Sequence, residues 1–199
     1  VIQAWYPGEE GGHAVADILY GRISPSAKLS VSYPNTEIDE PICYNEKIEQ
    51  DERIEWPFGY GLSYTQFSYG NLNMVKECPT DNDAVELTFS LTNAGKMRAD
   101  EVAQIYLSPT DKKQQIRPIQ LQGFARVTLE PGETKTVSMQ LSLRDFAIIT
   151  ENGKCVVEPG AFRITIGGQQ PDERSTELTG KKTACFDIVL NGEVTEVEY

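Results

Sequence analysis

Metal-binding side chains are scarce in this sequence. His13 is its only histidine, and the four cysteines, Cys43, Cys78, Cys155 and Cys185, never occur at the C-x-x-C spacing of zinc sites. These two absences argue against a zinc site. Four cysteines allow three complete pairings, and their positions do not choose among them. Cys155 and Cys185 lie in apparent strands, so buried free thiols fit them at least as well as a disulfide.

Long apolar runs and basic clusters are also missing. No stretch is apolar for long enough to span a bilayer, and Val1 is not followed by a charged and then apolar leader. We therefore expect a mature or truncated piece of a protein, whose secretion signal, if any, is not in this chain. The net charge of −12 disfavours nucleic acid as a partner, because phosphates need clustered Lys and Arg. Solubility explains the acidic surface, which does not repel neutral sugars.

The few candidate catalytic motifs each have a structural explanation. Glu9 and Glu10 are two carboxylates, as sugar hydrolysis requires, but neighbouring residues point in different directions. Acidic residues just before a helix favour its positive end, so we interpret this pair as a helix entry. Residues 61–65 (GLSYT) lack the second glycine of a nucleophile elbow, and a serine hydrolase would have only His13 as its base. No P-loop or dinucleotide fingerprint occurs.

The first part of the chain predicts one helix and one strand. Residues 13–20 have apolar side chains four apart, which predicts a short helix that Gly21 ends. Alternation over residues 29–33 predicts a strand that Pro34 stops. One helix and one strand cannot enclose a core. We therefore expect residues 1–34 to pack against a part of the protein that lies upstream.

Residues 35–66 are expected to be a linker. Residues 35–56 are charged and irregular, which is typical of a chain that runs over a surface. In residues 57–65, glycines allow tight turns while aromatic side chains anchor the backbone. The aromatics here and near the N-terminus could stack on sugars, but we favour packing that pins the chain to a domain surface. These aromatics are Trp5, Tyr6, Trp56, Phe58 and Tyr60.

Residues 67–199 have the pattern of an immunoglobulin-like β-sandwich, so the fold class is mainly β. Apolar and polar residues alternate, and turn signals such as Glu130-Pro131-Gly132-Glu133 separate the segments. The candidate strands are 67–76, 84–93, 101–108, 117–128, 134–143, 154–157, 161–167 and 183–190. These strands carry no cluster of exposed aromatics, so we expect no flat sugar-binding platform on them.

The order of these features resembles the late part of a glycoside hydrolase of family 3, which includes β-glucosidases and β-xylosidases. Residues 4–12 (AWYPGEEGG), 16–21 and 24–29 are similar to the last helix and strand of the family's α/β sandwich domain. Residues 57–64 resemble its linker. Residues 120–133 and 162–168 are similar to its fibronectin type III-like domain.

The resemblance implies three parts: residues 1–34 as the end of the α/β sandwich domain, 35–66 as a linker, and 67–199 as the fibronectin type III-like domain. It also implies a parent enzyme that removes terminal β-linked sugars with retention, and that is periplasmic or secreted. In the family, the nucleophilic Asp lies in an N-terminal barrel and the acid/base Glu lies upstream of residues 5–8. No catalytic residue, metal or organic cofactor is therefore expected in this chain, whose partners would be those upstream domains and a glycoside substrate.

One alternative comes from another functional class. The chain could be an independent carbohydrate-binding or adhesion module with a fibronectin type III-like fold. Residues 1–34 distinguish the two hypotheses, because a free-standing module has no use for an orphan helix and strand.

Overall fold

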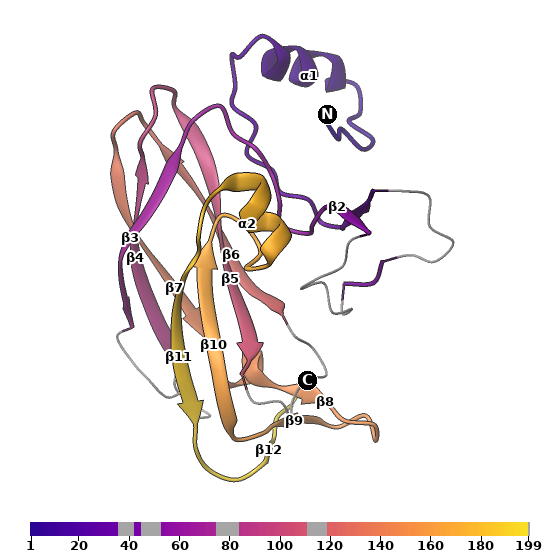
Figure 1. Cartoon of the computed structure of the whole chain (residues 1–199), viewed down its shortest axis with the longest axis vertical. Helices are drawn as coiled ribbons and strands as arrows, with labels where there is room; N and C mark the ends of the chain where they lie inside the picture. The colour runs from indigo at the N-terminus through magenta and orange to yellow at the C-terminus, as the bar shows by residue number, and fades with distance from the viewer. Residues whose placement is uncertain (36–41, 45–52, 75–83, 111–118, 199) are drawn as a thin grey trace.

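The centre of the molecule is a β-sandwich of two antiparallel sheets (Figure 1). The computed structural model describes all residues except 36–41, 45–52, 75–83, 111–118 and 199. In strand order, one sheet contains β3 (Phe67–Met74), β4 (Val85–Asn93) and β7 (Thr134–Leu141). The other contains β11 (Ala184–Leu190), β10 (Gly160–Gly167), β5 (Ala99–Pro109) and β6 (Gln120–Leu129). The predicted mainly β sandwich is confirmed.

Apolar and polar residues alternate along these segments, which explains why they form strands with one side facing a common core. Along β4, every second residue is buried, including Leu87 and Phe89, which pair with Met139 and Val137 of β7. The facing sheet contributes buried side chains such as Ile105. Each Å² of apolar surface removed from water stabilises the fold by about 25 cal/mol. The apolar layer between the two sheets is therefore the main source of stability.

The eight strands predicted for this region are all present among the described residues, with small shifts at several ends. The predicted ends at 75–76 and 117–118 lie outside the described residues. The turn at Glu130–Glu133 forms as expected, because Gly132 has a φ of +76° and the Glu133 amide donates to the Glu130 carbonyl at 3.0 Å. Several short elements were not predicted from the sequence. They are η2 (Leu143–Phe146), β8 (Ile148–Ile149), α2 (Glu173–Thr179) and β12 (Thr195–Glu196).

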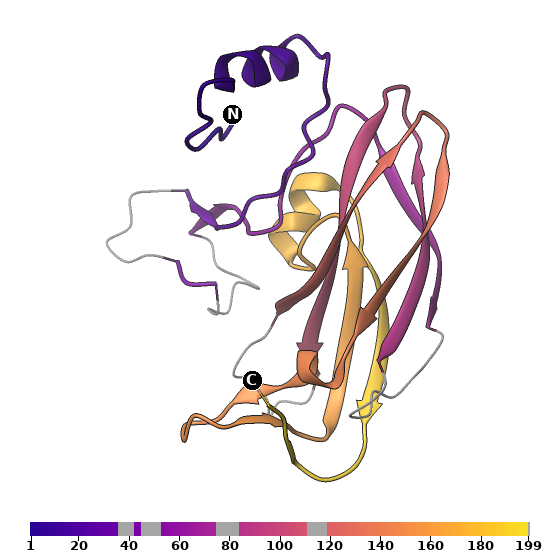
Figure 2. The same cartoon turned by 180° about the vertical axis from the view of Figure 1, so that it is seen from behind.

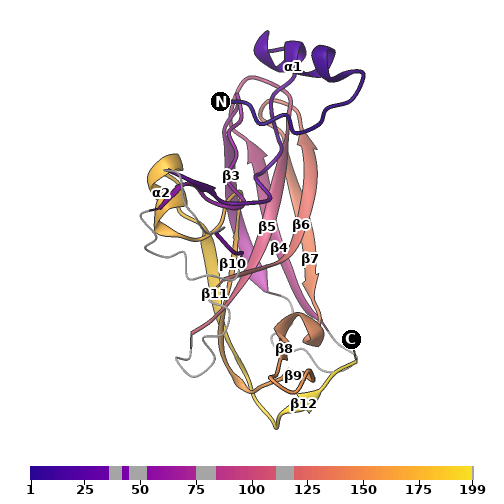
Figure 3. The same cartoon turned by 90° about the vertical axis from the view of Figure 1, so that its right-hand side faces the viewer.

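Helix α2 has ordinary start and stop signals that could have been recognised. Asp172 is its N-cap and accepts a hydrogen bond from the Ser175 amide at 2.7 Å, while Gly180 ends it in the left-handed conformation. The strands β8, β12 and β9 (Cys155–Val157) form a small third sheet. Figure 3 shows this sheet at the end of the sandwich opposite α1.

The N-terminal segment differs from its prediction. The helix is present as α1 (Gly11–Leu19), and Gly21 follows it with a φ of +68°. The strand predicted over residues 29–33 is wrong. Only β1 (Tyr33–Pro34) forms, and it pairs with β2 (Ile54–Trp56).

A competing set of backbone hydrogen bonds explains that error. The Leu29 amide donates to the Tyr60 carbonyl at 2.8 Å, and the Gly59 amide donates to the Leu29 carbonyl at 2.7 Å. The backbone at Leu29 is therefore hydrogen-bonded to residues 59 and 60, which are about thirty residues further along the chain. Strand β2 also lies inside the stretch that was expected to be irregular.

The described cysteines include no buried thiol. Cys155 in β9 is half-buried and Cys185 in β11 is exposed, and both are free thiols. The prediction of buried thiols is therefore wrong for Cys185, because it occupies an outward-facing position of β11. Cys43 is exposed, and Cys78 lies outside the described residues.

Candidate functional site

A polar junction lies on the outer face of the four-stranded sheet. Residues 57–65, here called the junction loop, run across this face near α2 (Figure 2). Gln104 and Tyr106 are on the outer side of β5, since Ile105 points into the core. They are nevertheless only 2% and 0% exposed, because the junction covers them. This face is therefore an internal interface.

Gly59 makes the closest approach in the junction. Its φ is +78°, and its carbonyl accepts a hydrogen bond from the Gln104 side-chain amide at 3.1 Å. A Cβ on Gly59 would lie 2.3 Å from the Tyr106 hydroxyl oxygen and 2.7 Å from Gln104 Oε1. The Tyr106 hydroxyl donates to Gln104 Oε1, and burial raises the pKa of Tyr106, so the hydroxyl stays protonated. Both the positive φ and the lack of room for a Cβ require glycine at position 59.

Residues 24–29, here called the connector, bind the junction loop. The Ser24 hydroxyl is 2.9 Å from the Ser63 hydroxyl and accepts a hydrogen bond from the Tyr64 amide at 3.0 Å. Gly61 allows the two segments to touch, because a Cβ there would lie 2.4 Å from the Ala27 carbonyl oxygen. The connector is therefore part of the junction.

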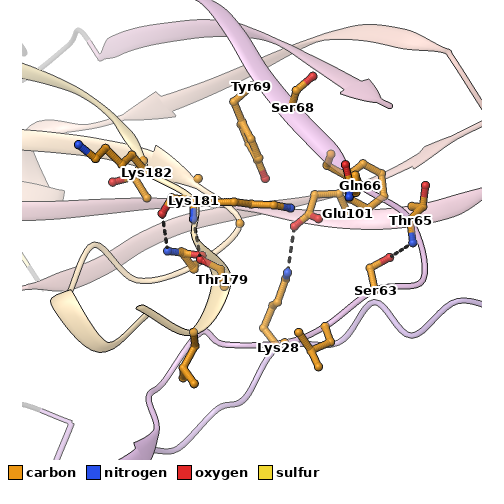
Figure 4. A pocket seen from close by; sticks show the side chains of 18 of the residues that line it. Lys28, Ser63, Thr65, Gln66, Ser68, Tyr69, Glu101, Thr179, Lys181 and Lys182 are labelled. Atoms are coloured by element: carbon orange, nitrogen blue, oxygen red, sulfur yellow. Dashed lines mark hydrogen bonds and ion pairs between the residues drawn. The ribbon is translucent and has the colours of Figure 1, made fainter. Parts of the chain in front are cut away.

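A buried ion pair ties the connector to the sandwich itself. Lys28 Nζ lies 3.1 Å from Glu101 Oε1 of β5, and the two side chains are 13% and 7% exposed (Figure 4). A charge removed from water at this depth is costly without an opposite charge beside it. Each of these two side chains therefore depends on the other.

The end of the junction loop is fixed by a buried asparagine. Thr65 donates to Asn93 Oδ1 at 2.6 Å, and the Gly95 amide donates to the same oxygen at 3.1 Å. The Asn93 amide donates to the carbonyls of Met97 and Leu129 at 2.8 and 3.1 Å. Asn93 is fully buried and all its polar atoms are used, so it joins the loop to the turns at this end of the sandwich.

Helix α2 secures the other side of the junction. Arg174 donates from Nε to the Glu55 carbonyl of β2 at 3.2 Å and also lies 3.5 Å from the Glu55 carboxylate. Together with Lys28 and Thr65, this contact attaches the N-terminal third of the chain at several points.

The carboxylate pair considered in the sequence analysis lies away from this junction. Glu10 is the N-cap residue of α1, and its carboxylate is 2.6 Å from His13 Nδ1. Glu9, Glu10 and His13 are all exposed. They therefore occupy a helix entry, although Glu10 makes no capping hydrogen bond with its side chain.

The aromatic residues divide into two groups. Phe58 packs on Tyr44 with ring centroids 4.8 Å apart, and Trp56 packs edge-on against Tyr33 at 6.2 Å. Tyr60 is half-buried. These residues pin the chain as predicted.

Trp5 and Tyr6 behave differently, because they are 56% and 100% exposed. Trp5 also has a φ of +50°, which is unusual for a residue with a side chain. Packing within the described part of the chain therefore does not account for these two residues.

Lys28, Glu101 and Asn93 were not predicted as site residues. A signal was present for two of them. Asn93 and Glu101 occupy inward-facing positions in otherwise apolar alternations of β4 and β5, and a polar residue there needs a buried partner. Among the described residues, no group of three His, Cys, Asp or Glu could hold a metal ion. Within the same ranges, no helix is long and apolar enough to cross a membrane.

Comparison with known proteins gives two matches to family models. Residues 1–64 match the glycosyl hydrolase family 3 C-terminal domain, and residues 101–170 match the fibronectin type III-like domain. A β-xylosidase from Formosa agariphila is 34% identical over 91% of this chain and 27% of its own length. A β-glucosidase from Kluyveromyces marxianus is 35% identical over 86% of this chain and 22% of its own length.

Solved structures agree with these matches. A β-glucosidase from Listeria innocua in complex with glucose aligns with a TM-score of 0.79 at 27% identity, over 97% of this chain and 28% of that one. The K. marxianus β-glucosidase aligns with a TM-score of 0.76 at 32% identity, over 98% of this chain and 24% of that one. The chain spans about a quarter of the length of these relatives. It belongs to glycoside hydrolase family 3 and corresponds to the C-terminal part of the family's enzymes.

Proposed function

We propose that this chain is the architectural C-terminal part of a retaining exo-acting β-glycosidase, most simply a β-glucosidase, that hydrolyses terminal β-linked sugars. The relatives named β-glucosidase and β-xylosidase support the reaction class. The observation that carries the architectural role is the junction, where the Lys28–Glu101 pair and the Ser24–Ser63 contact attach the connector to the sandwich. Residues 1–34, 35–66 and 67–199 would then act as one support.

Three carboxylates of the described residues already have structural roles in this chain. A retaining glycosidase needs two carboxyl groups about 5–5.5 Å apart on either side of one bond. Glu101 is paired with Lys28, Asp172 caps α2, and Glu10 contacts His13 at an exposed helix entry. We therefore assign the nucleophilic Asp and the acid/base Glu to the upstream barrel and α/β sandwich domains of the whole enzyme.

The exposed apolar residues of the N-terminal segment support the same proposal. Leu19, Ile23 and Val31 are 64%, 56% and 46% exposed in this chain. An independent carbohydrate-binding or adhesion module would gain nothing from leaving such residues in water. We propose that they face the upstream domains, which would be the partners of this chain together with the glycoside substrate.

The whole protein that contains this chain should hydrolyse 4-nitrophenyl β-glucoside or β-xyloside and leave the matching α-glycosides intact. Retention means that the first product seen by proton NMR is the β-anomer, before mutarotation, because two successive inversions occur at the same carbon. Initial release of the α-anomer would contradict the retaining mechanism. Failure to cleave either β-glycoside would contradict the reaction class.

A further inference from the structure

Two asparagines of this chain are followed directly by glycine, in the pairs Asn152-Gly153 and Asn191-Gly192. Both pairs are exposed, and nothing lies within 4 Å of the position of a Cβ on either glycine. In such a pair the backbone nitrogen of the glycine can attack the side-chain carbonyl carbon of the asparagine, since no Cβ shields that nitrogen or restricts the backbone. Spontaneous deamidation is therefore chemically open to both asparagines, and their backbone surroundings distinguish them.

Asn152 lies in a closed turn between β8 and β9. The Gly153 amide donates to the Thr150 carbonyl at 2.9 Å, and the Thr150 amide donates to the Lys154 carbonyl at 2.9 Å. The Thr150 hydroxyl also accepts a hydrogen bond from the Lys154 amide at 3.2 Å. The nitrogen that would attack Asn152 is therefore held against the Thr150 carbonyl by its own proton, and this hydrogen bond must break before attack.

Asn191 lies in an open loop, residues 191–194, which curves round the lower end of the molecule from β11 to β12 (Figure 1). Within the described part of the chain, neither the Gly192 amide nor the Asn191 side chain makes a hydrogen bond. Gly192 has a φ of +126°, a conformation that glycine adopts readily. The hydrogen bonds that hold the turn at Asn152 therefore have no counterpart at Asn191.

We propose that Asn191 is a site of spontaneous deamidation and that the closed turn protects Asn152. The Gly192 nitrogen loses its proton and bonds to Asn191 Cγ, the bond from Cγ to the side-chain nitrogen breaks, and ammonia leaves. Water then opens the cyclic imide at either of its two carbonyl carbons. One opening gives aspartate, and the other gives isoaspartate, in which the backbone runs through the former side chain. This modification goes beyond the proposed function, which assigns none to this chain.

Isoaspartate at position 191 lengthens the backbone by one methylene group just before β12. The position of β12 depends on its pairing with β9, in which Thr195 lies opposite Val157. The Val197 amide donates to the Cys155 carbonyl at 3.0 Å, and the Val197 side chain packs against the core. The added methylene group should loosen this pairing, whereas aspartate adds only a negative charge.

Incubation of the whole protein that contains this chain at mildly alkaline pH, followed by peptide mapping with mass spectrometry, tests the proposal. We expect Asn191 to deamidate about fivefold or more faster than Asn152, because a hydrogen bond contributes about 1 kcal/mol and about 1.4 kcal/mol in a barrier changes a rate tenfold. The matched control is the same protein unfolded in urea. Unfolding removes the turn, so the two rates should converge.

Amide hydrogen exchange measures the effect on β12. The Val197 amide should exchange faster in the isoaspartate form than in the original protein. Freshly prepared Asn191→Asp is the control, because it carries the new charge on a backbone of normal length. Its Val197 amide should exchange at the original rate.

Three results would overturn the proposal. The first is deamidation of Asn152 in the folded protein as fast as that of Asn191. The second is a rate difference that persists in urea, which would assign it to the flanking sequence instead of the turn. The third is unchanged exchange at Val197 in the isoaspartate form, which would mean that the longer backbone does not loosen β12. None of these results depends on whether the whole protein hydrolyses glycosides.

Discussion

Gly59→Ala should lower the free energy of unfolding of this chain by about 2–4 kcal/mol. Two costs combine. Alanine at a φ of +78° is strained, and its Cβ would lie 2.3 Å from the Tyr106 hydroxyl oxygen, in a place that Tyr106 cannot leave without breaking its bond to Gln104. Urea unfolding followed by tryptophan fluorescence measures the loss, and Trp56 lies three residues from the change.

Gly132→Ala separates the two costs. Gly132 has nearly the same backbone conformation, with a φ of +76°, but nothing lies within 4 Å of the position of its Cβ. This variant should lose only the conformational part, about 1 kcal/mol. Equal losses in the two variants would mean that the close approach of Gly59 to β5 contributes nothing to stability, and that the junction loop does not depend on it.

Lys28→Met should be the second large effect, a loss of about 3 kcal/mol or more in the free energy of unfolding. The substitution leaves the Glu101 carboxylate buried without its cation. Adding Glu101→Gln to Lys28→Met should recover much of the loss, because the uncompensated charge is then gone. Chemical unfolding of the two single variants and the double variant forms a double-mutant cycle that measures the coupling.

The exposed pair of Arg163 and Asp187 provides the control for this cycle. Arg163 Nε is 2.7 Å from Asp187 Oδ1, a distance no longer than that of the buried pair, but about half of each side chain is exposed. Arg163→Met should cost no more than about 1 kcal/mol, because water screens such pairs. A loss at Lys28 as small as the loss at Arg163 would show that the buried pair does not hold the connector on the sandwich.

The sandwich could be predicted from the sequence because its strands and turns are indicated by patterns of neighbouring residues. In β4 the alternation around Leu87 and Phe89 defines both the strand and its inward face, and turn signals such as Gly132 mark where strands end. The predicted strand at residues 29–33 failed for the opposite reason. Its apparent alternation competes with backbone bonds between Leu29 and Tyr60, a contact set by the arrangement of distant segments.

The junction was only partly predictable. The aromatics and glycines of residues 57–65 indicated a pinned chain, and Phe58 is indeed packed on Tyr44. The reason for each glycine was out of reach, since Gly59 meets Tyr106 and Gly61 meets the Ala27 carbonyl only in the folded chain. The inward-facing position of Glu101 in β5 indicates that it needs a buried partner, but Lys28 is far from it in sequence, so the sequence does not identify Lys28 as that partner.

We propose that this part of the enzyme supplies support and that the upstream part supplies the chemistry. The most direct test is to assay the pure 199-residue chain and the whole protein side by side on 4-nitrophenyl β-glucoside and β-xyloside. We expect hydrolysis by the whole protein and none by the chain alone. Turnover by the pure chain that disappears in Glu9→Gln or Glu10→Gln would contradict the account, because it would place the catalytic carboxylates at the entry of α1.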